Sequence, residues 1–496
     1  MRHVLLTAGL LLGPAVAAAQ QAPPKTPASL SLADAIAIAR DQNPAYRQAL
    51  NNRGPAAWGV RGAFSSLLIP SVTTGAGVSY TGPGSQTFLS SSFSQSVSTV
   101  SSFYDLNLSW QLSGTTLSQP SLAKAQLHAV DEDIAGAANA LVTGITQQYL
   151  TVLQTRDQAE VARRTVARND EFLKLAQARF NVGQATLIDV RQAQVARGQA
   201  EVALLRAETA VSVEKLRLFE QMGVTPPIDV QAVQLTDTFV VQTPAWQLPD
   251  LLTMAEQQNP ALKALRARER AAAWGVRAAT STYGPSVSLS AGWSGFTQQF
   301  TDVDPIIRRQ QKELGGQRTA CIENNQIRAS AGLPPNPPDC DVYLWGPAYE
   351  QPLRDQNSVF PFNFTRQPFQ ARLSISLPLF TNFSRAQRVS EARAQHGDME
   401  EAVRARGLAV QTEVSQAFLT LQTAFRTTGL QDTNRTAARE QLQLATERYR
   451  VGSGTFFELL DAQVASLRAE SDYVNAIYDY HKAVSALEAA VGRSLR

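Results

Sequence analysis

The stretch RFNVGQATLIDVRQAQVA (residues 179–196) has a near-copy later in the chain, RYRVGSGTFFELLDAQVA (residues 448–465). Gly183 and Gly452 stand at the same place in the two stretches. Each glycine interrupts a long run of helix-forming residues, so each stretch predicts a tight turn between two helices. A chain that repeats this turn is expected to repeat the helices that flank it.

A second motif occurs twice and marks where each repeat begins. QNPAYRQALNNRGPAAWGVR (residues 42–61) matches QNPALKALRARERAAAWGVR (residues 258–277). In both copies a proline follows an asparagine and disfavours helix at that asparagine, which predicts a break between two helices. We therefore expect two tandem repeats at 20–223 and 249–492, an inter-repeat linker at 224–248 and a tail at 493–496.

The first 19 residues carry the pattern of a secretory signal peptide: Arg2, an apolar segment at 4–16 and three alanines at 17–19. Beyond them no run approaches the roughly 18 apolar residues of a membrane-spanning helix, so any membrane insertion is expected to use strands. Export also favours a disulfide between the only two cysteines, Cys321 and Cys340, because compartments outside the cytoplasm are oxidising.

Charge and motif content exclude several functional classes. Lys and Arg number 45 and Asp and Glu 42, a net charge of +3, which indicates neither nucleic acid nor an acidic substrate. His128, His396 and His481 lack the spacing of metal ligands, and the sequence has no nucleophile elbow and no phosphate-binding loop. We expect no catalytic residue, no metal site and no cofactor.

Four segments alternate apolar and polar residues, which predicts β-strands with two unlike faces. They lie at about 71–81, 104–113, 286–295 and 369–379. About ten residues suffice for a tilted strand to cross a bilayer, although a soluble sandwich with one wet face shows the same alternation. Since an open sheet edge is not tolerated in lipid, several copies would have to assemble, and two copies or three could each close a barrel.

Long helical hairpins follow the strands in each repeat. The first is expected at about 120–221 with its tip at 182–186, and the second at about 385–491 with its tip at 451–455. A seven-residue spacing of apolar side chains predicts that each hairpin packs as an antiparallel coiled coil. Its members are Ile188, Val195, Val202 and Leu216 in the first hairpin and Leu460, Leu467 and Val474 in the second.

The second repeat is longer than the first. The two turn glycines, Gly183 and Gly452, lie farther apart in the chain than the two opening motifs at Gln42 and Gln258, so the second repeat must contain an insertion between its opening motif and its turn. We assign the insertion to a long external loop at 297–367, which contains both cysteines.

Together these features resemble the TolC family of outer-membrane efflux channels over nearly the whole mature chain. The resemblance is carried by the two Val-Gly turns, the Ala-Gln-Val-Ala runs after them, the paired Asn-Pro motifs and the Leu-Pro-Leu-Phe sequence at 377–380. It implies a mainly α fold with membrane β. Three chains would form a homotrimer in which a twelve-stranded β-barrel in the outer-membrane lipid continues into a twelve-helix α-barrel across the periplasm.

The resemblance also implies a function and partners. The trimer would be a passive exit duct, and its hairpin tips would meet a periplasmic adaptor attached to an inner-membrane transporter. The tip residues that this assigns are Val182, Gly183, Val451 and Gly452. An enzyme is not implied. A non-conducting periplasmic coiled-coil scaffold or a surface adhesin would show the same helical periodicity and is the alternative.

Gate residues follow from the resemblance as well. Glu458 and Asp461 match acids that ring the narrow end of the channel, and Asp189 is their partial counterpart in the first repeat. Tyr449 matches a gate tyrosine, whereas Gly454 stands where some members have a gate arginine. The charge of the gate is therefore expected to come mainly from the second repeat.

Overall fold

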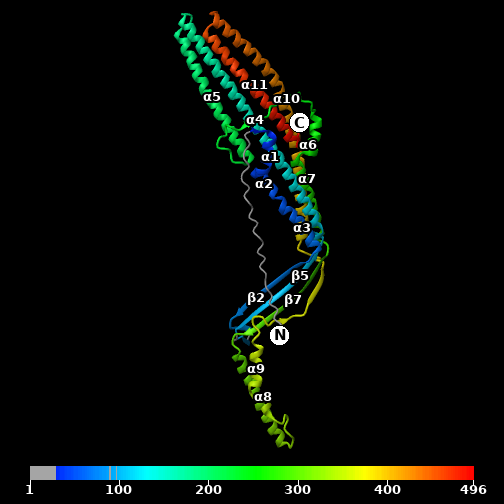
Figure 1. The fold of residues 1–496 in the computed structure, drawn as a ribbon. Helices are drawn as coiled ribbons and strands as arrows, with labels where there is room; N and C mark the ends of the chain where they lie inside the picture. The colour runs from blue at the N-terminus through cyan, green and yellow to red at the C-terminus, as the bar shows by residue number, and fades with distance from the viewer. Residues whose placement is uncertain (1–28, 89–90, 96–97, 496) are drawn as a thin grey trace. The chain divides into compact units, whose positions relative to one another are not determined.

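The computed structural model describes residues 29–495 except 89–90 and 96–97 (Figure 1). The signal peptide expected at residues 1–19 lies outside the described residues. The chain divides into two units, one of Met1–Ala57, Ala125–Ala271 and Gly397–Arg496, the other of Trp58–Lys124 and Ala272–His396. Helices predominate in the described chain and the long strands all belong to the second unit, which confirms a mainly α fold with strands.

Two helical hairpins make up most of the first unit. α4 (Gly114–Asn181) and α10 (Ser384–Val451) have 68 residues each, and α5 (Leu187–Met222) and α11 (Phe456–Val491) have 36 each. α5 returns along α4 and α11 returns along α10 (Figure 1). No helix in the described part of the chain is both long enough and apolar enough to cross a membrane.

α4 begins at Gly114 rather than near residue 120 as expected. The expected start followed Pro120, because proline disrupts a helix interior. In the structure Ser113 caps the helix upstream: its Oγ accepts the amide of Thr116 (3.3 Å), and its own amide donates to the Thr116 hydroxyl (2.7 Å). Pro120 is therefore accommodated inside the helix, in its second turn.

Shorter helices precede the strands of each repeat. They are α1 (Leu32–Gln42), α2 (Pro44–Asn51) and α3 (Arg53–Leu68) in the first repeat, and α6 (Leu248–Gln258) and α7 (Pro260–Ser281) in the second.

A side-chain clasp at Asn259 joins three helix ends in the second repeat. The Oδ1 of Asn259 accepts the amide of Leu262 in the first turn of α7 (3.1 Å), and its Nδ2 donates to the carbonyl of Ala490 at the end of α11 (3.0 Å). Gly492 ends α11 with a φ of +85°, and a Cβ at this residue would lie 2.9 Å from the Cα of Asn259. Only glycine permits both this φ and this approach.

Asn43 forms the same clasp in the first repeat. Its Oδ1 accepts the amide of Tyr46 at the start of α2 (2.9 Å), and its Nδ2 donates to the carbonyl of Gln221 near the end of α5 (2.7 Å). Gly223 then ends α5 with a φ of +75°. Asn43 is half-buried, whereas Asn259 is only 4% exposed. One motif therefore sets where a short helix ends, where the next begins and where a hairpin returns.

Two apolar clusters pack at the clasped end of the hairpins. One joins α1, α4, α5 and the linker around Tyr149, Phe219 and Met222, and the other joins α6, α10 and α11 around Leu251 and Leu487. The inter-repeat linker contributes β6 (Gln234–Leu235) to the first cluster, where β6 pairs in parallel with β1 (Ser29–Leu30).

The apolar stripe expected to form the seam of the first hairpin is exposed instead, so this part of the prediction is wrong. Ile188 and Val195 are 66% and 58% exposed, and Val202 and Leu216 are exposed as well. The side chains that α5 buries in this half are Val190, Ala193 and Ala200. Small alanines let two helices approach closely, so this face packs inwards in place of the bulkier stripe. In the second hairpin Leu460, Leu467 and Val474 are half-buried.

The second unit is built on an antiparallel sheet in the order β2, β5, β7, β9. Its strands are β2 (Ser71–Thr81), β5 (Thr99–Leu112), β7 (Ser286–Phe300) and β9 (Gln370–Ser376), with β8 (Thr365–Arg366) also pairing with β7 and β3 (Gly84–Phe88) with β4 (Ser91–Gln95) as a separate hairpin. β5 begins at residue 99 rather than 104 and β7 extends to 300 rather than 295, because the two remain paired over this length. β9 stops before Pro378, which has no amide to donate.

The pairing register gives the sheet two unlike faces. Leu106 is aligned with Trp293 on one face, and Asn107 is aligned with Gly292 and Gln370 on the other. Successive residues of a strand point to opposite faces, so one face is mainly apolar, with Ser102 and Thr297 as buried polar exceptions, and the other carries mainly serine, asparagine, glutamine and glycine.

The segment expected to be a long loop, residues 297–367, is largely helical. It contains α8 (Asp304–Ser330), α9 (Pro347–Gln356) and a short 3-10 helix, η1 (Cys340–Tyr343). Prolines and other turn residues gather between α8 and η1, whereas α8 itself is rich in Arg and Gln. These residues favour helix strongly enough to outweigh the glycine pair within it.

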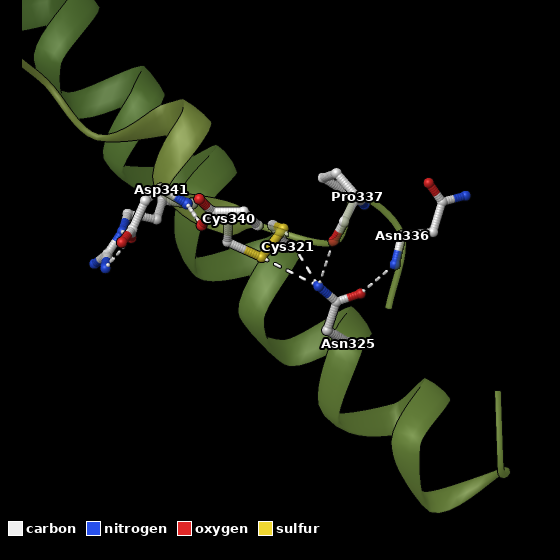
Figure 2. Close-up of a disulfide and its surroundings, with 8 residues drawn as sticks. Cys321, Asn325, Asn336, Pro337, Cys340 and Asp341 are labelled. Atoms are coloured by element: carbon white, nitrogen blue, oxygen red, sulfur yellow. Dashed lines mark hydrogen bonds and ion pairs between the residues drawn. A yellow bond between two sulfur atoms is a disulfide. The ribbon is translucent and has the colours of Figure 1, made fainter. Parts of the chain in front are cut away.

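Cys321 of α8 and Cys340 of η1 form the predicted disulfide, with Cα atoms 5.8 Å apart (Figure 2). Asn325, one helical turn after Cys321, reinforces this link. Its Nδ2 donates to the carbonyl of Pro337 (2.9 Å), and its Oδ1 accepts the amide of Asn336 (2.8 Å). The covalent bond and the asparagine together hold the proline-rich turn against α8.

Replacing Asn259 by alanine is expected to cost about 2 kcal/mol of stability, because both a helix cap and a buried hydrogen bond are lost. Asn43→Ala is the matched control and should cost less, since Asn43 is half-buried. Thermal unfolding in detergent measures both. A larger loss for Asn43→Ala would contradict the assignment of the buried clasp.

Removing the disulfide with Cys321→Ala and Cys340→Ala should loosen the turn that follows α8. Closing a loop of this size contributes about 3 kcal/mol, so trypsin cleavage after Arg328 should quicken by roughly a hundredfold. Cleavage after the exposed Arg404 in α10 should keep its rate and serves as the control. Unchanged cleavage after Arg328 would show that Asn325 holds the turn without the disulfide.

Candidate gate at the hairpin tips

The two hairpin tips have the same backbone. Gly183 and Gly452 adopt φ values of +76° and +82°, which side-chain-bearing residues rarely adopt. The amide of Gly183 donates to the carbonyl of Phe180 (2.9 Å), and the amide of Gly452 to that of Tyr449 (3.2 Å). The valine before each glycine points to solvent, Val182 being 68% exposed and Val451 74%. Each tip therefore presents a valine on a rigid turn.

The arginine four residues before each glycine donates a hydrogen bond to a carbonyl of the turn. The Nη2 of Arg179 donates to the carbonyl of Gln184 (3.1 Å), and the Nη2 of Arg448 donates to the carbonyl of Ser453 (3.4 Å). We did not predict these arginines as site residues, although they occupy the same place in the two repeated stretches. That repetition was the signal that could have identified them.

The acids after the two turns make different contacts. Asp189 belongs to a capping box: its amide donates to the hydroxyl of Thr186 (3.2 Å), and its carboxylate accepts the amide of Thr186 (2.8 Å). Thr455 caps α11 in the same way by accepting the amide of Glu458 (3.2 Å), but the Glu458 carboxylate instead lies 3.6 Å from Nη1 of Arg448. Asp189 is therefore committed to the helix end, and Glu458 to an ion pair.

Gly454 leaves the space in which this ion pair lies. A Cβ at Gly454 would come within 3.1 Å of the Cβ of Arg448 and 3.2 Å of Oε2 of Glu458. A side chain at residue 454 would therefore press against both partners of the contact between Arg448 and Glu458. Asp461, one turn further along α11, is exposed.

Tyr449 is buried, with only 3% of its surface exposed. The guanidinium of Arg179 lies over its ring, 4.6 Å from the centroid, and the ring of Phe456 packs against it at 5.5 Å. Burial, and after it the negative charge of Asp189, raises the pKa of Tyr449 above its ordinary value. The hydroxyl therefore stays neutral at physiological pH. The contacts that hold the ring come from residues of the same chain.

The first and second hairpins meet in one apolar cluster at their tips. Its members are Phe172, Ala176, Val190, Ala193, Leu442, Tyr449, Phe456, Leu459 and Ala462. They come from α4, α5, α10 and α11, so the two repeated turns are packed as a pair. Tyr449 is the predicted gate residue at the centre of this contact, while the predicted acids lie around it.

A buried polar layer follows this cluster along α11. The Nε2 of Gln463 donates to Oδ1 of Asn169 in α4 (2.7 Å). Two helical turns further on, the buried Glu470 pairs with Arg168 of α4 (3.3 Å) and with Arg439 of α10 (3.2 Å). Phe456, Gln463 and Glu470 recur at seven-residue spacing and are buried residues of α11 along this contact. Because two of the three are polar, the spacing of apolar residues in the sequence does not reveal them.

Alanine substitutions at the two tip glycines distinguish two energetic costs: the cost of a left-handed turn, which both positions share, and the cost of a packing clash, which differs between them. Both changes place a Cβ in the left-handed region, at a cost of about 1 kcal/mol. Gly452→Ala should cost more, because its Cβ would lie 3.3 Å from Nη2 of Arg179, whereas a Cβ at Gly183 meets nothing within 4 Å. Amide hydrogen exchange at the two turns measures the difference. Faster exchange at Gly183→Ala than at Gly452→Ala would contradict this packing.

Comparison with known proteins shows to which family this architecture belongs. A family model for outer membrane efflux proteins matches residues 35–224 and 351–493, more than half of the chain. The chain is 25% identical over 172 residues to the outer membrane efflux protein BepC of Brucella suis and 26% identical over 172 residues to the outer membrane protein TolC of Vibrio cholerae. Each alignment covers 35% of this chain, and it spans 36% of BepC and 39% of TolC.

Solved structures show the same fold over nearly the full length. A membrane protein from Pseudomonas aeruginosa superposes with a TM-score of 0.69 at 19% identity, covering 93% of this chain and 90% of that one. The outer membrane protein VceC of Vibrio cholerae superposes with a TM-score of 0.67 at 19% identity, covering 94% and 97%. The outer-membrane channel OprN gives 0.68 at 18% identity, covering 93% and 89%. With the family match, these likenesses show that the chain belongs to the outer membrane efflux protein family, which is TolC-like in fold.

Proposed function

We propose that this chain is the outer-membrane exit duct of a tripartite export system. It would work as a homotrimer, in which the four long strands of each copy close a twelve-stranded barrel. The two hairpins of each copy would build a twelve-helix tube in the periplasm. Membership of the outer membrane efflux protein family supports this proposal, and the likeness to VceC and OprN supports the fold of each chain.

The exposed apolar face of the sheet is the observation that carries the proposal. Val72, Leu373 and Ile375 on this face are 63%, 66% and 71% exposed. A face this apolar is a liability in water but suits contact with lipid. Among the residues that the structure describes, β2 and β9 each pair on one side only, and lipid cannot satisfy their open backbone groups. Pairing β9 of one copy with β2 of the next would satisfy those groups around a closed ring.

The exposed stripe of α5 supports the same assembly. Ile188, Val195 and Val202 recur at heptad spacing and are at least 47% exposed. Such a stripe normally meets another helix. In the trimer a hairpin of the neighbouring copy would cover it, so the heptad would form a seam between chains rather than within one.

The hairpin tips are the proposed meeting point with a periplasmic adaptor, which would connect the duct to an inner-membrane transporter. Val182 and Val451 would make apolar contacts there, and the repeated turns would offer six similar tips per trimer. Transport through the duct would be passive, because the driving energy would come from the transporter.

Acids at the tips would give the entrance a negative charge. Glu458 is partly neutralised by Arg448 at 3.6 Å, whereas Asp461 is exposed. Asp461 should therefore dominate the ring and Glu458 should add to it. A ring of carboxylates attracts cations and repels anions.

Reversal potentials in planar bilayers under a KCl gradient test this proposal. Asp461→Asn with Glu458→Gln should abolish most of the cation preference, and Asp461→Asn alone should remove more of it than Glu458→Gln alone. Glu401→Gln is the control, because this exposed acid of α10 already pairs with Arg404. An unchanged reversal potential in the double variant would disprove the ring, and purified protein that opens no channel would favour a scaffold or an adhesin.

A further inference from the structure

Two neighbouring phenylalanines break the pattern of the polar face of the sheet. Phe103 of β5 is aligned with Phe296 of β7 and with Gly77 of β2. Along β5 the neighbours of Phe103 on the same face are Ser101 and Asp105. We refer to Phe103 and Phe296 as the aromatic rung. Period-two patterning places apolar side chains on the opposite face, so the sheet pattern does not account for the rung.

Both rings of the aromatic rung are exposed, and the ring of Phe103 rests against the backbone of Gly77. Phe103 is 47% exposed and Phe296 is 43% exposed. A Cβ at Gly77 would lie 2.6 Å from Cε1 of Phe103, so the ring covers the glycine directly. Such cover of a strand glycine by a cross-strand aromatic is a known stabilising device in sheets. The ring is therefore held against the wall of the sheet.

A carboxylate lies one row away on the same face. Asp105 is seated over Gly75 in the same manner, with a Cβ at Gly75 placed 2.6 Å from Oδ1 of Asp105. Two glycines on the same face of β2 thus hold an acid and an aromatic ring side by side along β5. Aromatic faces attract cations, and a nearby carboxylate strengthens that attraction.

We infer that the aromatic rung is a specificity-determining constriction of the duct that retards bulky apolar organic cations. This inference rests on the proposed function, in which the polar face of the sheet lines the lumen. Three copies would bring six rings to one level, with three Asp105 carboxylates on the adjacent row. The rings would contact the apolar body of a permeating molecule, and the carboxylates would attract its charge.

Gly77 determines how far the ring of Phe103 reaches into the lumen. Any side chain at residue 77 would occupy the space that the Phe103 ring now fills, because a Cβ at Gly77 would lie 2.6 Å from Cε1 of Phe103, closer than Cβ atoms approach other atoms in proteins. The ring would then swing away from the wall and narrow the passage. Removing the ring instead would widen it, so the two substitutions have opposite expected effects.

Single-channel conductance of the purified full-length protein in planar bilayers tests this arrangement. Phe103→Ala should raise the conductance and Gly77→Ala should lower it. In the double variant the conductance should return to that of Phe103→Ala, since no ring is left to displace. Tyr80→Ala is the matched control, because Tyr80 lies on the opposite face of β2 and is 66% exposed.

Block by tetraphenylphosphonium measures the proposed selectivity. Phe103→Ala with Phe296→Ala should weaken the block about tenfold, within the range of cation–π contacts, and Tyr80→Ala should leave it unchanged. If Phe103→Ala and Gly77→Ala change neither conductance nor block in a channel that conducts, the rung is not a constriction and the duct still stands. A wild-type protein that opens no conductance would overturn the duct and the rung together.

Discussion

The arrangement of both repeats depends on an asparagine that serves three helix ends at once. Asn43 and Asn259 each cap the helix that follows them and donate to a carbonyl at the end of a returning hairpin. The proline that follows prevents the preceding helix from continuing, and the glycine that ends the hairpin lets the two backbones touch. Since the returning arm of each hairpin is one uninterrupted helix of 36 residues, fixing one of its ends also fixes which of its residues meet their partners at the tip.

At the tips the two repeats share a backbone and differ in their charges. Gly183 and Gly452 turn the chain in the same way, and Arg179 and Arg448 support the turns through the same kind of contact. The acids that follow have separate roles, because Asp189 closes a capping box and Glu458 pairs with Arg448. A duplicated hairpin thus supplies two similar turns but an uneven distribution of charge, with Asp461 as the acid that neither a cap nor this ion pair engages.

Much of the fold could be predicted from sequence because its signals are local. The turn glycines, the Asn-Pro breaks, the alternating strands and the cysteine pair each depend on a few adjacent residues. Three features were missed or misplaced, and only the first of them depends on packing between helices, because the other two come from a local cap and from local helix propensity. The bulky heptad of α5 is exposed and small alanines take the seam, Ser113 starts α4 ahead of Pro120, and the segment expected to be a loop contains α8. Tyr449 was recognised by position, but its burial beneath Arg179 depends on a contact between two hairpins that lie far apart in the sequence.

The proposed duct places one face of the sheet in lipid and lets the other face line a water-filled lumen. Spin labels on adjacent residues of β9 test it most directly, since Leu373 and Ser374 point to opposite faces. In protein reconstituted into vesicles, a label at Leu373→Cys should be relaxed mainly by oxygen, which concentrates in lipid. A label at Ser374→Cys should be relaxed mainly by a water-soluble nickel chelate. Equal access of the nickel chelate to both labels would show that the two faces of the sheet do not face lipid and lumen.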